Sequence, residues 1–311
     1  MNGKQLAVII AFIGAAAILL NNQGASKTNQ FESWKSTHGI VYSNQFENTY
    51  RERVFLENLK KIESHNADKT QTYQMGLNQF SALTHEEFAE IYLTLIPNED
   101  SHPMVGEEHV ELAGDIDWEA QGAVTPVKNQ GQCGSCWAFS ATGGLEGLSK
   151  IAYGELQSFS ESQLVDCSAK YGNHGCNGGL MDNAFKFVRD NGIVHEDEYP
   201  YVAKVNTCKK ATGDFKISGF TDVKACTGLA SAIQERPISV AVDATNWSPY
   251  KSGVFSNCGT RLNHGVTLVG TSDGSWWVKN SWGPSWGEKG HIRVKSGNTC
   301  GICNAASYPN K

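Results

Sequence analysis

The sequence predicts an α+β protein made of two units, a helical front and a larger back that combines helices with strands. Residues 25–111 carry 7 Lys/Arg against 14 Asp/Glu and no cysteine, whereas residues 112–311 carry 18 against 18, all nine cysteines and every tryptophan except Trp34. Apolar residues recur with helical spacing in the front, and the back adds short apolar runs typical of strands. A back of about 200 residues buries roughly 70% of its unfolded surface and can form a full core.

The overall composition excludes several classes of protein. With 40% hydrophobic and 19% charged residues, the 311-residue chain is typical of a globular protein, not of a disordered, collagenous or coiled-coil one. The formal net charge is −6, and no run of Lys or Arg is longer than two residues. The sequence therefore offers no basic surface for nucleic acid, and no nucleic-acid partner is expected.

The first segment has the pattern of a signal peptide. Fifteen apolar residues, Leu6–Leu20, follow Lys4 and precede a polar and small stretch that ends near Gly24–Ser26. The alternative is a membrane anchor, but fifteen residues at 1.5 Å rise span about 22 Å, short of the roughly 30 Å hydrocarbon core. We therefore expect residues 1–24 to be removed, leaving a chain without a membrane anchor that has passed through an oxidising compartment.

Two helices and a linker are predicted in the front unit. One helix presents a stripe at i, i+4, i+7 and i+11, formed by Phe55, Leu59, Ile62 and Asn66. After an extended or turn segment over residues 76–80, Thr84 can cap a short acidic helix. Residues 97–114 are polar, contain two prolines and lack periodicity, which is typical of an exposed linker that proteases cut.

The most specific run in the back unit is Asn129–Phe139 (NQGQCGSCWAF), which contains Cys133 and Cys136. This pair could be half of a zinc site, a redox dithiol, or two cysteines with different roles. A zinc site would draw on Cys300 and Cys303, which lie near the C-terminus and leave other cysteines over. A thioredoxin-like couple would need a preceding strand, but residues 125–130 are loop-like. The odd number of cysteines raises the question whether eight of them form disulfides and one is a free, reactive thiol.

Cys136 falls in the first turn of a predicted buried helix. Gly154 ends this helix, and its apolar stripe is formed by Ala138, Ala141, Leu145 and Leu148. The partial positive charge at a helix N-terminus favours a thiolate, but it supplies only about 1 kcal/mol. A pKa lower by roughly three units, about 4 kcal/mol, is needed for half of the thiol to ionise near pH 5.5. The remainder of this stabilisation of the thiolate requires an ion pair with an imidazolium.

His264 stands out among the histidines of the back unit, 128 residues after Cys136. It precedes an apolar strand over residues 265–270, and a second, aromatic-rich strand leads to Asn280 and Trp282. An asparagine there can accept a hydrogen bond from the ring and fix its tautomer, while the indole excludes water. Taken alone, His264 is more often a structural histidine. Together with Cys136 and Asn280 it becomes the candidate partner of a nucleophile.

These motifs together resemble the papain-like cysteine peptidases of the cathepsin L type, as a full-length precursor. The likeness covers nearly everything after the signal peptide. In the back unit it rests on the run around Cys136, on Cys176–Gly179 followed by Leu-Met-Asp, on Asn263–Gly265 and on Asn280–Gly287 (NSWGPSWG). In the front unit the residues spaced as in the family's interrupted propeptide helix motif are Glu47, Arg51, Val54, Phe55, Asn58, Ile62 and Asn66.

The resemblance implies a papain-like fold of two subdomains, an α-rich half and a β-barrel-like half, with a cleft between them. The α-rich half would hold the Cys136 helix and a helix over residues 180–191. The other half would be built on strands such as 238–243, 265–270 and 291–295. The chain would divide into a signal peptide (1–24), an inhibitory propeptide like the I29 domain (25–111) and the mature peptidase domain (112–311).

The resemblance also implies a cysteine endopeptidase, since no inserted His-His loop closes the cleft as in carboxydipeptidases of the family. Cys136 would attack the peptide carbonyl as a thiolate and form an acyl-enzyme, with His264 as ion-pair partner and acid and Asn280 orienting the ring. Gln130, through its side chain, and the backbone N–H of Cys136 would form the oxyanion hole.

Substrate contacts are carried over from the family to nine positions: Gly178, Gly179, Leu180, Met181, Ala241, Leu262, Asn263, Trp282 and Ala305. The two glycines would let a substrate backbone come close. Small, apolar walls favour an apolar side chain at P2, the second residue before the cut. Met181 also fits a helical core stripe, so its place in the pocket stays open.

The resemblance pairs Cys133 with Cys176, Cys167 with Cys208, and Cys258 with Cys300. Cys226 and Cys303 have no counterpart in the family pattern, so a fourth bridge and two free thiols are both open. Neither a metal nor a cofactor is expected.

By the same resemblance, the front unit is an intramolecular inhibitor whose extended tail lies through the cleft, backwards relative to substrate. Protonating its carboxylates would weaken it, so we expect the linker to be cut near Val110–Gly114 at acidic pH. One residue departs from the family: Ala82 stands where the motif Gly-x-Asn-x-Phe-x-Asp has its acid, with Glu86 and Glu87 as candidate substitutes.

The remaining expectations concern partners, place and alternatives. Polypeptides are the expected substrates and cystatin-type inhibitors are candidate partners of a monomer in a lysosome, a digestive vacuole or outside the cell. Asn246-Trp-Ser248 is the one N-glycosylation sequon. Two other classes stay open: a catalytically silent binding protein with the same fold, and a dithiol oxidoreductase using Cys133 and Cys136.

Overall fold

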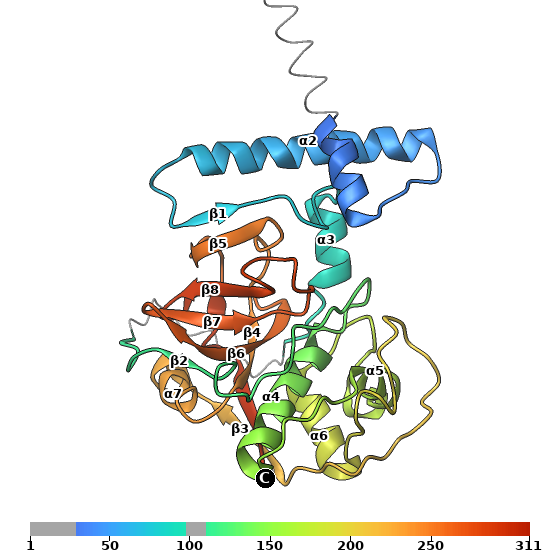
Figure 1. Ribbon diagram of the computed structural model, residues 1–311. Helices are drawn as coiled ribbons and strands as arrows, with labels where there is room; N and C mark the ends of the chain where they lie inside the picture. The colour runs from blue at the N-terminus through green and yellow to red at the C-terminus, as the bar shows by residue number, and fades with distance from the viewer. Residues whose placement is uncertain (1–28, 98–109) are drawn as a thin grey trace, which may run out of the picture.

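The computed structural model describes residues 29–97 and 110–311, so the predicted signal peptide lies outside the described residues. The front unit covers one end of the back unit: α2 (Gln45–Ala67) runs across it, and α3 (His85–Tyr92) descends toward the junction between the sheet and the helices (Figure 1). Within the described part of the chain, no helix is long and apolar enough to cross a membrane.

The predicted stripe of the front unit lies on α2. Asn44 caps the helix by accepting a 2.9 Å hydrogen bond from the backbone N–H of Glu47. The buried residues of the helix are Val54, Phe55, Leu59 and Ile62, of which Phe55 and Leu59 pack with Phe31, Trp34 and Ala82 in a small apolar core. The helical stretch over residues 29–38 supplies Phe31 and Trp34 to this core.

Polar residues of α2 hold the chain that follows it. Asn58 Nδ2 donates to two carbonyls, Ser81 O at 3.0 Å and Leu83 O at 2.9 Å. Asn66 exchanges two hydrogen bonds of 2.9 Å with the backbone of Met75 in the short strand β1 (Tyr73–Met75). Asn58 and Asn66 thus fix the backbone on both sides of the extended segment predicted over residues 76–80.

Thr84 caps α3 as predicted, and Glu87 completes a capping box by accepting from the backbone of Thr84. Glu87 also pairs with Arg51 of α2 at 2.6 Å, and Arg51 donates to the carbonyl of Ala82 at 3.1 Å. Ala82 itself is 2% exposed in the small apolar core, where a carboxylate would be desolvated. Of the two candidate substitutes for the missing acid, Glu87 is thus the one in an ion pair, whereas Glu86 is exposed.

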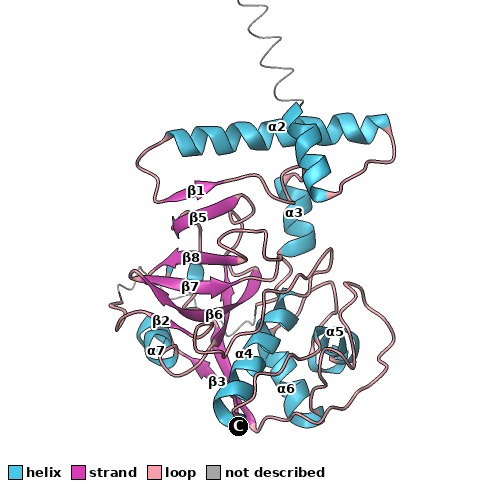
Figure 2. Ribbon diagram, in the orientation of Figure 1, coloured by secondary structure: helices cyan, strands magenta, loops and turns pink. Residues whose placement is uncertain are grey.

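Apart from α7 (Ala225–Ala232), which lies beside the strands, the helices of the back unit lie on one side and its strands on the other (Figure 2). They are α4 (Cys136–Tyr153), α5 (Glu161–Cys167), the 3-10 turn η1 (Ala169–Tyr171) and α6 (Met181–Asn191). The first fourteen residues of α4 are all buried, so the helix is enclosed on every side and not only along its predicted stripe. Glycine permits this: a Cβ at Gly143 would lie 2.3 Å from Thr267 Oγ1, so a strand packs directly on the helix backbone.

The strands form one sheet with an open path, in the order β1-β5-β8-β7-β6-β4-β9-β3. Their bounds, with those of α7 and the 3-10 turn η2, are β2 (Ile116–Asp117), β3 (Gly219–Val223), α7 (Ala225–Ala232), β4 (Ile238–Val242), β5 (Tyr250–Phe255), β6 (His264–Ser272), β7 (Ser275–Lys279), β8 (His291–Lys295), η2 (Thr299–Gly301) and β9 (Ala306–Asn310). The short strand β2 pairs with β6 off this path, and β5 with β8 is the parallel pair among otherwise antiparallel ones. The front unit contributes β1, which extends the sheet by pairing with β5.

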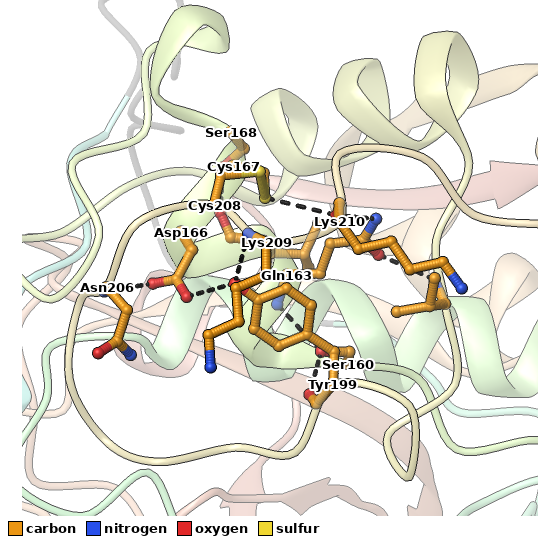
Figure 3. The surroundings of a disulfide bond; sticks show 12 residues. Ser160, Gln163, Asp166, Cys167, Ser168, Tyr199, Asn206, Cys208, Lys209 and Lys210 are labelled. Carbon is orange, nitrogen blue, oxygen red and sulfur yellow. Dashed lines mark hydrogen bonds between the residues drawn. A yellow bond between two sulfur atoms is a disulfide. The ribbon is translucent and has the colours of Figure 1, made fainter.

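Four disulfides join the cysteines of the back unit: Cys133–Cys176, Cys167–Cys208, Cys226–Cys303 and Cys258–Cys300. The pair Cys226–Cys303 resolves the choice left open by the family pattern in favour of a fourth bridge. Around Cys167–Cys208, the side chains of Asp166, Tyr199 and Gln163 hydrogen-bond the surrounding loop (Figure 3). All nine cysteines lie in the described residues, and Cys136 is the free one.

Candidate active site

Cys136 is the first residue of α4, and its side chain is fully buried. Backbone N–H groups of Trp137 and Gly265 reach toward its sulfur, as does Thr94 of the front unit. Gly265 follows His264 at the start of β6, which packs on α4. The structure therefore places Cys136 beside the residue that follows His264, although Cys136 and His264 are 128 residues apart in the sequence.

His264 and Asn280 lie on the paired strands β6 and β7, His264 at the start of one and Asn280 just past the end of the other. The imidazole Nε2 is 2.8 Å from Asn280 Oδ1, which also accepts the backbone N–H of Ser281 at 2.8 Å. Because a carboxamide oxygen only accepts, Nε2 must carry the proton in this bond. Nδ1 is the remaining nitrogen, and among the described residues it has no hydrogen-bond partner.

The ring of Trp282 lies over this pair, with its centroid 4.7 Å from that of His264. Its side chain is 1% exposed and is surrounded by Phe80, Phe88 and Tyr92 of the front unit. The indole thus excludes water from the His264–Asn280 hydrogen bond, as the sequence suggested. It lies with the imidazole, away from the apolar residues carried over for the P2 pocket.

Burial controls the charges of the catalytic pair in this precursor. Burial raises the pKa of the Cys136 thiol, although hydrogen bonds from Gly265 and Thr94 act in the opposite direction. Burial also lowers the pKa of His264 to about 4, against the opposing effect of Asn280. Both groups are therefore neutral at mildly acidic pH. The ion pair expected from the sequence is disfavoured while residues 92–96 cover the site, because these residues remove the water that would solvate it.

Gln130 is buried in the loop before α4. Its Nε2 donates to Cys133 O at 3.0 Å, its Oε1 accepts from Ser281 Oγ at 2.7 Å, and its backbone N–H donates to Ser281 O at 2.8 Å. Ser281 follows Asn280, so these bonds tie the loop of Gln130 to the loop that orients His264. The carboxamide has a second N–H available for a ligand.

The tail of the front unit, defined as residues 94–97, crosses the site as an extended segment. Leu95 N donates to Asn263 O, and Ile96 N donates to Gly179 O, both at 3.1 Å. A Cβ at Gly178, where φ is +111°, would lie 2.1 Å from Thr94 O. Glycine at position 178 thus lets another backbone approach closely, which is the property that the sequence predicted for a substrate contact.

Leu95 is buried in an apolar cluster. It is 6% exposed and belongs to one cluster with Leu180, Met181, Ala241 and Leu262, against which Ala305 packs. Met181 also packs toward β6, since its Sδ would lie 3.2 Å from a Cβ at Gly265. The apolar residues predicted for the P2 pocket therefore belong to one cluster with Leu95 or pack against it, and their role as a substrate pocket stays a prediction.

Sequence reasoning missed a buried charge cluster behind the site. Lys128 Nζ lies 2.8 Å from Glu146 and 2.7 Å from Glu161, both of which are 1% exposed or less. Lys279 of β7 donates to Thr125 Oγ1 at 3.0 Å in the same region. The cluster joins α4 and α5 to the sheet next to Asn280. Helical spacing could have marked Glu146 as an acid on a buried helix, but nothing in the sequence indicated its partners.

The alternatives that used Cys133 do not fit the structure. Cys133 is bonded to Cys176, which leaves no Cys133–Cys136 dithiol, and Cys300 and Cys303 are each bonded elsewhere. In the part of the chain that the structure describes, no three His, Cys, Asp or Glu side chains are grouped as metal ligands. The site instead combines a thiol at a helix N-terminus, a histidine oriented by an asparagine, and an occupied substrate groove.

Comparison with known proteins agrees with this geometry. The profile of the papain family cysteine proteases matches residues 112–310, and that of the cathepsin propeptide inhibitor domain (I29) matches residues 31–88. The chain is 45% identical over 308 residues to cathepsin L 2 of Paramecium tetraurelia, covering 96% of this chain and 98% of that protein. It is 40% identical to a cathepsin L-like protein of Caenorhabditis elegans, covering 98% of each chain.

Solved precursors have the same fold. The digestive procathepsin L 3 of Tenebrio molitor superposes with a TM-score of 0.83 at 40% identity, covering 92% of this chain and 99% of that one. The recombinant stem bromelain precursor gives a TM-score of 0.82 at 39% identity, covering 92% of this chain and 99% of that one. The chain belongs to the papain family of cysteine proteases. Its relatives and its I29 domain make it a cathepsin L-type cysteine endopeptidase in zymogen form, and the predicted α+β, papain-like fold is confirmed.

Proposed function

We propose that the processed chain cleaves peptide bonds with Cys136 as nucleophile, His264 as its ion-pair partner and general acid, and Asn280 as the residue that orients the imidazole. The observation that carries this assignment is the 2.8 Å contact between His264 Nε2 and Asn280 Oδ1, next to the free cysteine at the start of α4. The helix N-terminus and the imidazolium together favour the thiolate once water returns to the site.

The hydrogen bond to Asn280 decides which nitrogen carries out proton transfer. Because Nε2–H is held by Asn280, Nδ1 takes the thiol proton and later gives it to the leaving amine. The sulfur adds to the carbonyl carbon, the C–N bond then breaks, and a thioester remains on Cys136. Water, deprotonated by the neutral imidazole, adds to the thioester and releases the acid product and the thiol. Gln130 Nε2 and the backbone N–H of Cys136 stabilise the oxyanion in both steps.

The P2 pocket takes an apolar side chain. Support comes from Leu95, which is buried in the same apolar cluster as Leu180, Met181, Ala241 and Leu262, with Ala305 packed against that cluster. Asn263 O, Gly178 and Gly179 provide main-chain contacts for an extended substrate. Leu95 pairs with Gly179 in the parallel sense, so a substrate that pairs with Gly179 in the antiparallel sense runs the other way through the cleft.

Residues 25–111 act as the inhibitory propeptide and residues 112–311 as the mature enzyme, with the cut near Val110–Gly114 at acidic pH. Val110 is 7% exposed in the large core, whereas Glu111, Ala113 and Gly114 are exposed. This burial favours cleavage after Val110 over cleavage before it. Most of the preceding linker, residues 98–109, lies outside the described residues.

The enzyme works as a monomer on polypeptides in a lysosome or digestive vacuole, or outside the cell, and cystatin-type proteins inhibit it by occupying the same cleft. Four disulfides fit a protein that folds in an oxidising compartment.

Two precursors test the proposal: the native chain and Cys136→Ala. Each is held at about pH 5, the new N-terminus is sequenced, and cleavage of a peptide library and labelling by a thiol-directed epoxide are measured. The native chain is expected to process itself near residues 110–114, cut after apolar P2 residues and take up one label. Cys136→Ala, after processing by added active enzyme, should neither cleave the peptide library nor take up the label. Peptide cleavage that survives in Cys136→Ala would refute the assignment. A native chain that cleaves no peptide after processing would indicate a binding protein instead of a peptidase.

A further inference from the structure

Tyr201 connects two parts of the loop that leads into the catalytic helix. It lies in the α-rich half, in the chain that follows α6. Its ring packs edge-to-face on Phe139 of α4, with 4.8 Å between centroids. Its backbone N–H donates to Glu196 Oε1 at 2.7 Å, which fixes the base of the side chain. These two contacts therefore fix the orientation of the ring independently of its hydroxyl.

The hydroxyl has two partners. It lies 2.8 Å from the backbone carbonyl of Gln130 and 2.6 Å from Ser135 Oγ. A carbonyl oxygen can only accept, so the single phenolic proton goes to Gln130 O. The tyrosine oxygen then accepts the hydroxyl proton of Ser135. Both hydrogen bonds are satisfied together in this one arrangement.

One partner, the carbonyl of Gln130, belongs to a proposed oxyanion donor, and the other, Ser135, precedes the second proposed donor, Cys136. We define the oxyanion turn as residues 130–136; it begins with Gln130, whose side-chain amide is one donor, and ends with Cys136, whose backbone N–H is the other. Ser135 immediately precedes Cys136 and makes no capping hydrogen bond to α4 with its own side chain. The turn has no regular secondary structure between these ends, and Gly131 has a positive φ of +58°. A hydrogen-bonded link between the two ends of this turn therefore helps to set the separation of the two donors.

We propose that Tyr201 is a positioning residue of the peptidase reaction, whose hydroxyl holds the Gln130 and Cys136 ends of the oxyanion turn at the separation that the tetrahedral intermediate requires. The inference rests on the proposed roles of Gln130 and Cys136. It concerns only steps in which negative charge develops on the substrate oxygen. Binding of the substrate side chain at P2 occurs elsewhere, around Leu180 and Leu262, and should not depend on it.

The test uses the full-length precursor, activated by acid, in its native form and as Tyr201→Phe, which removes only the hydroxyl. Losing this restraint should lower kcat about tenfold, since a small misplacement of an oxyanion donor is enough for that effect, while KM stays within about twofold. A peptide aldehyde, which forms an oxyanion-bearing adduct with the thiol, should bind about tenfold more weakly. Alkylation of Cys136 by iodoacetamide, which creates no oxyanion, should keep its rate.

Tyr199→Phe is the matched control. Tyr199 is two residues away, and its hydroxyl also makes a short hydrogen bond, to Asp166 at 2.7 Å, but beside the Cys167–Cys208 disulfide (Figure 3). This variant is expected to melt at a lower temperature with native kcat and aldehyde affinity. Ser135→Ala, which removes the other partner, should resemble Tyr201→Phe, and the double variant should be little worse than either single one.

Three outcomes would overturn the inference. Native kcat and aldehyde affinity in Tyr201→Phe would show that the hydroxyl does not position the donors. An equal loss of aldehyde affinity and alkylation rate would show a general structural role. If Gln130→Ala keeps full activity while Cys136→Ala loses it, the oxyanion role of Gln130 fails and the inference with it, but the peptidase function stands.

Discussion

The front unit touches the enzyme through two regions that differ in how they are held. The body, residues 29–93, places Tyr73, Phe80, Phe88 and Tyr92 in the same apolar cluster as the core of the sheet. The tail, residues 94–97, is held by two main-chain hydrogen bonds and by the buried Leu95. An open volume of about 660 Å³ is lined by residues of both the tail and α3. From this difference we predict two separate tasks: the body provides most of the docking affinity, and the tail blocks the candidate site.

Polar contacts also attach the body to the back unit. Asn78 Nδ2 donates to Ser248 O and Gln79 Nε2 donates to Trp282 O, both at 2.7 Å. Trp282 also covers the His264–Asn280 pair, so the body anchors on the residue that protects the catalytic hydrogen bond. The tail adds Thr94 beside Cys136, whereas Tyr92, at the end of the body, lies against His264.

The largest expected effect concerns the thiol itself. Because burial raises the pKa of Cys136 and lowers that of His264, the precursor at about pH 5.5 should react with iodoacetamide at least about a hundredfold more slowly than the processed enzyme. The rate is measured by mass spectrometry of the alkylated peptide, with Cys136→Ala as the blank. Equal rates in the two forms would mean that the tail blocks substrate without changing the charges of the pair.

The next effect weakens the body. Phe88 is 2% exposed and packs against Trp282 with 5.2 Å between ring centroids. Phe88→Ala should cost about 3–5 kcal/mol of front-unit stability and docking, so the precursor should process itself at a higher pH and much faster. Phe46→Ala is the control, because Phe46 on α2 is 90% exposed. Processing is followed by gel at a series of pH values. A Phe88→Ala precursor as latent as the native one would mean that the tail, not the body, carries the affinity.

The sequence predicted well what depends on local pattern. The stripe of α2, the cap at Thr84, the helix that begins at Cys136 and the strand after His264 each follow from spacing over a few residues. The site was found because its motifs fall at the ends of such elements, where side chains have fixed directions. The odd cysteine count raised the question of four bridges and one free cysteine, but the pairing of Cys226 with Cys303 had to come from the fold.

Features that arise from distant packing were not predictable. Nothing in residues 94–96 marks them as the segment that enters the groove, since their place is set by the body that precedes them. The partners of Lys128 are on two separate helices, and the burial of Val110 depends on a sheet built from residues after it. The neutral state of the catalytic pair likewise depends on a segment about 40 residues upstream in sequence, which no local argument about a thiol near a helix could include.

A smaller effect is expected from the tail. Leu95 is 6% exposed in the apolar cluster proposed as the P2 pocket, and Leu95→Ala should weaken the closed state by about 2 kcal/mol, less than Phe88→Ala does. The precursor should stay folded and docked, but it should bind a reversible peptide inhibitor of the cleft more readily. Ile96→Ala is the matched control, because Ile96 is 43% exposed. If Leu95→Ala detaches the whole front unit, as judged by its susceptibility to added protease, the two regions are not separable.

The smallest effect comes from the Arg51–Glu87 pair, which stabilises the body internally. Burial raises the pKa of Glu87, but hydrogen bonds from Arg51 and Thr84 outweigh it, so the pKa lies below its ordinary value of 4.5. The carboxylate thus contributes stability above about pH 4.5, and the contribution is lost as the pH falls through the lowered pKa. The pair contributes about 1 kcal/mol to the stability of the body, as for other partly exposed pairs.

In the Cys136→Ala background, which cannot process itself, Glu87→Gln should melt at a lower temperature at pH 6 and show a shallower loss of stability below pH 4.5. Glu90→Gln, which removes an exposed charge from the same helix, should keep the native pH dependence, and a native profile in Glu87→Gln would place the acid sensitivity of the body in other carboxylates.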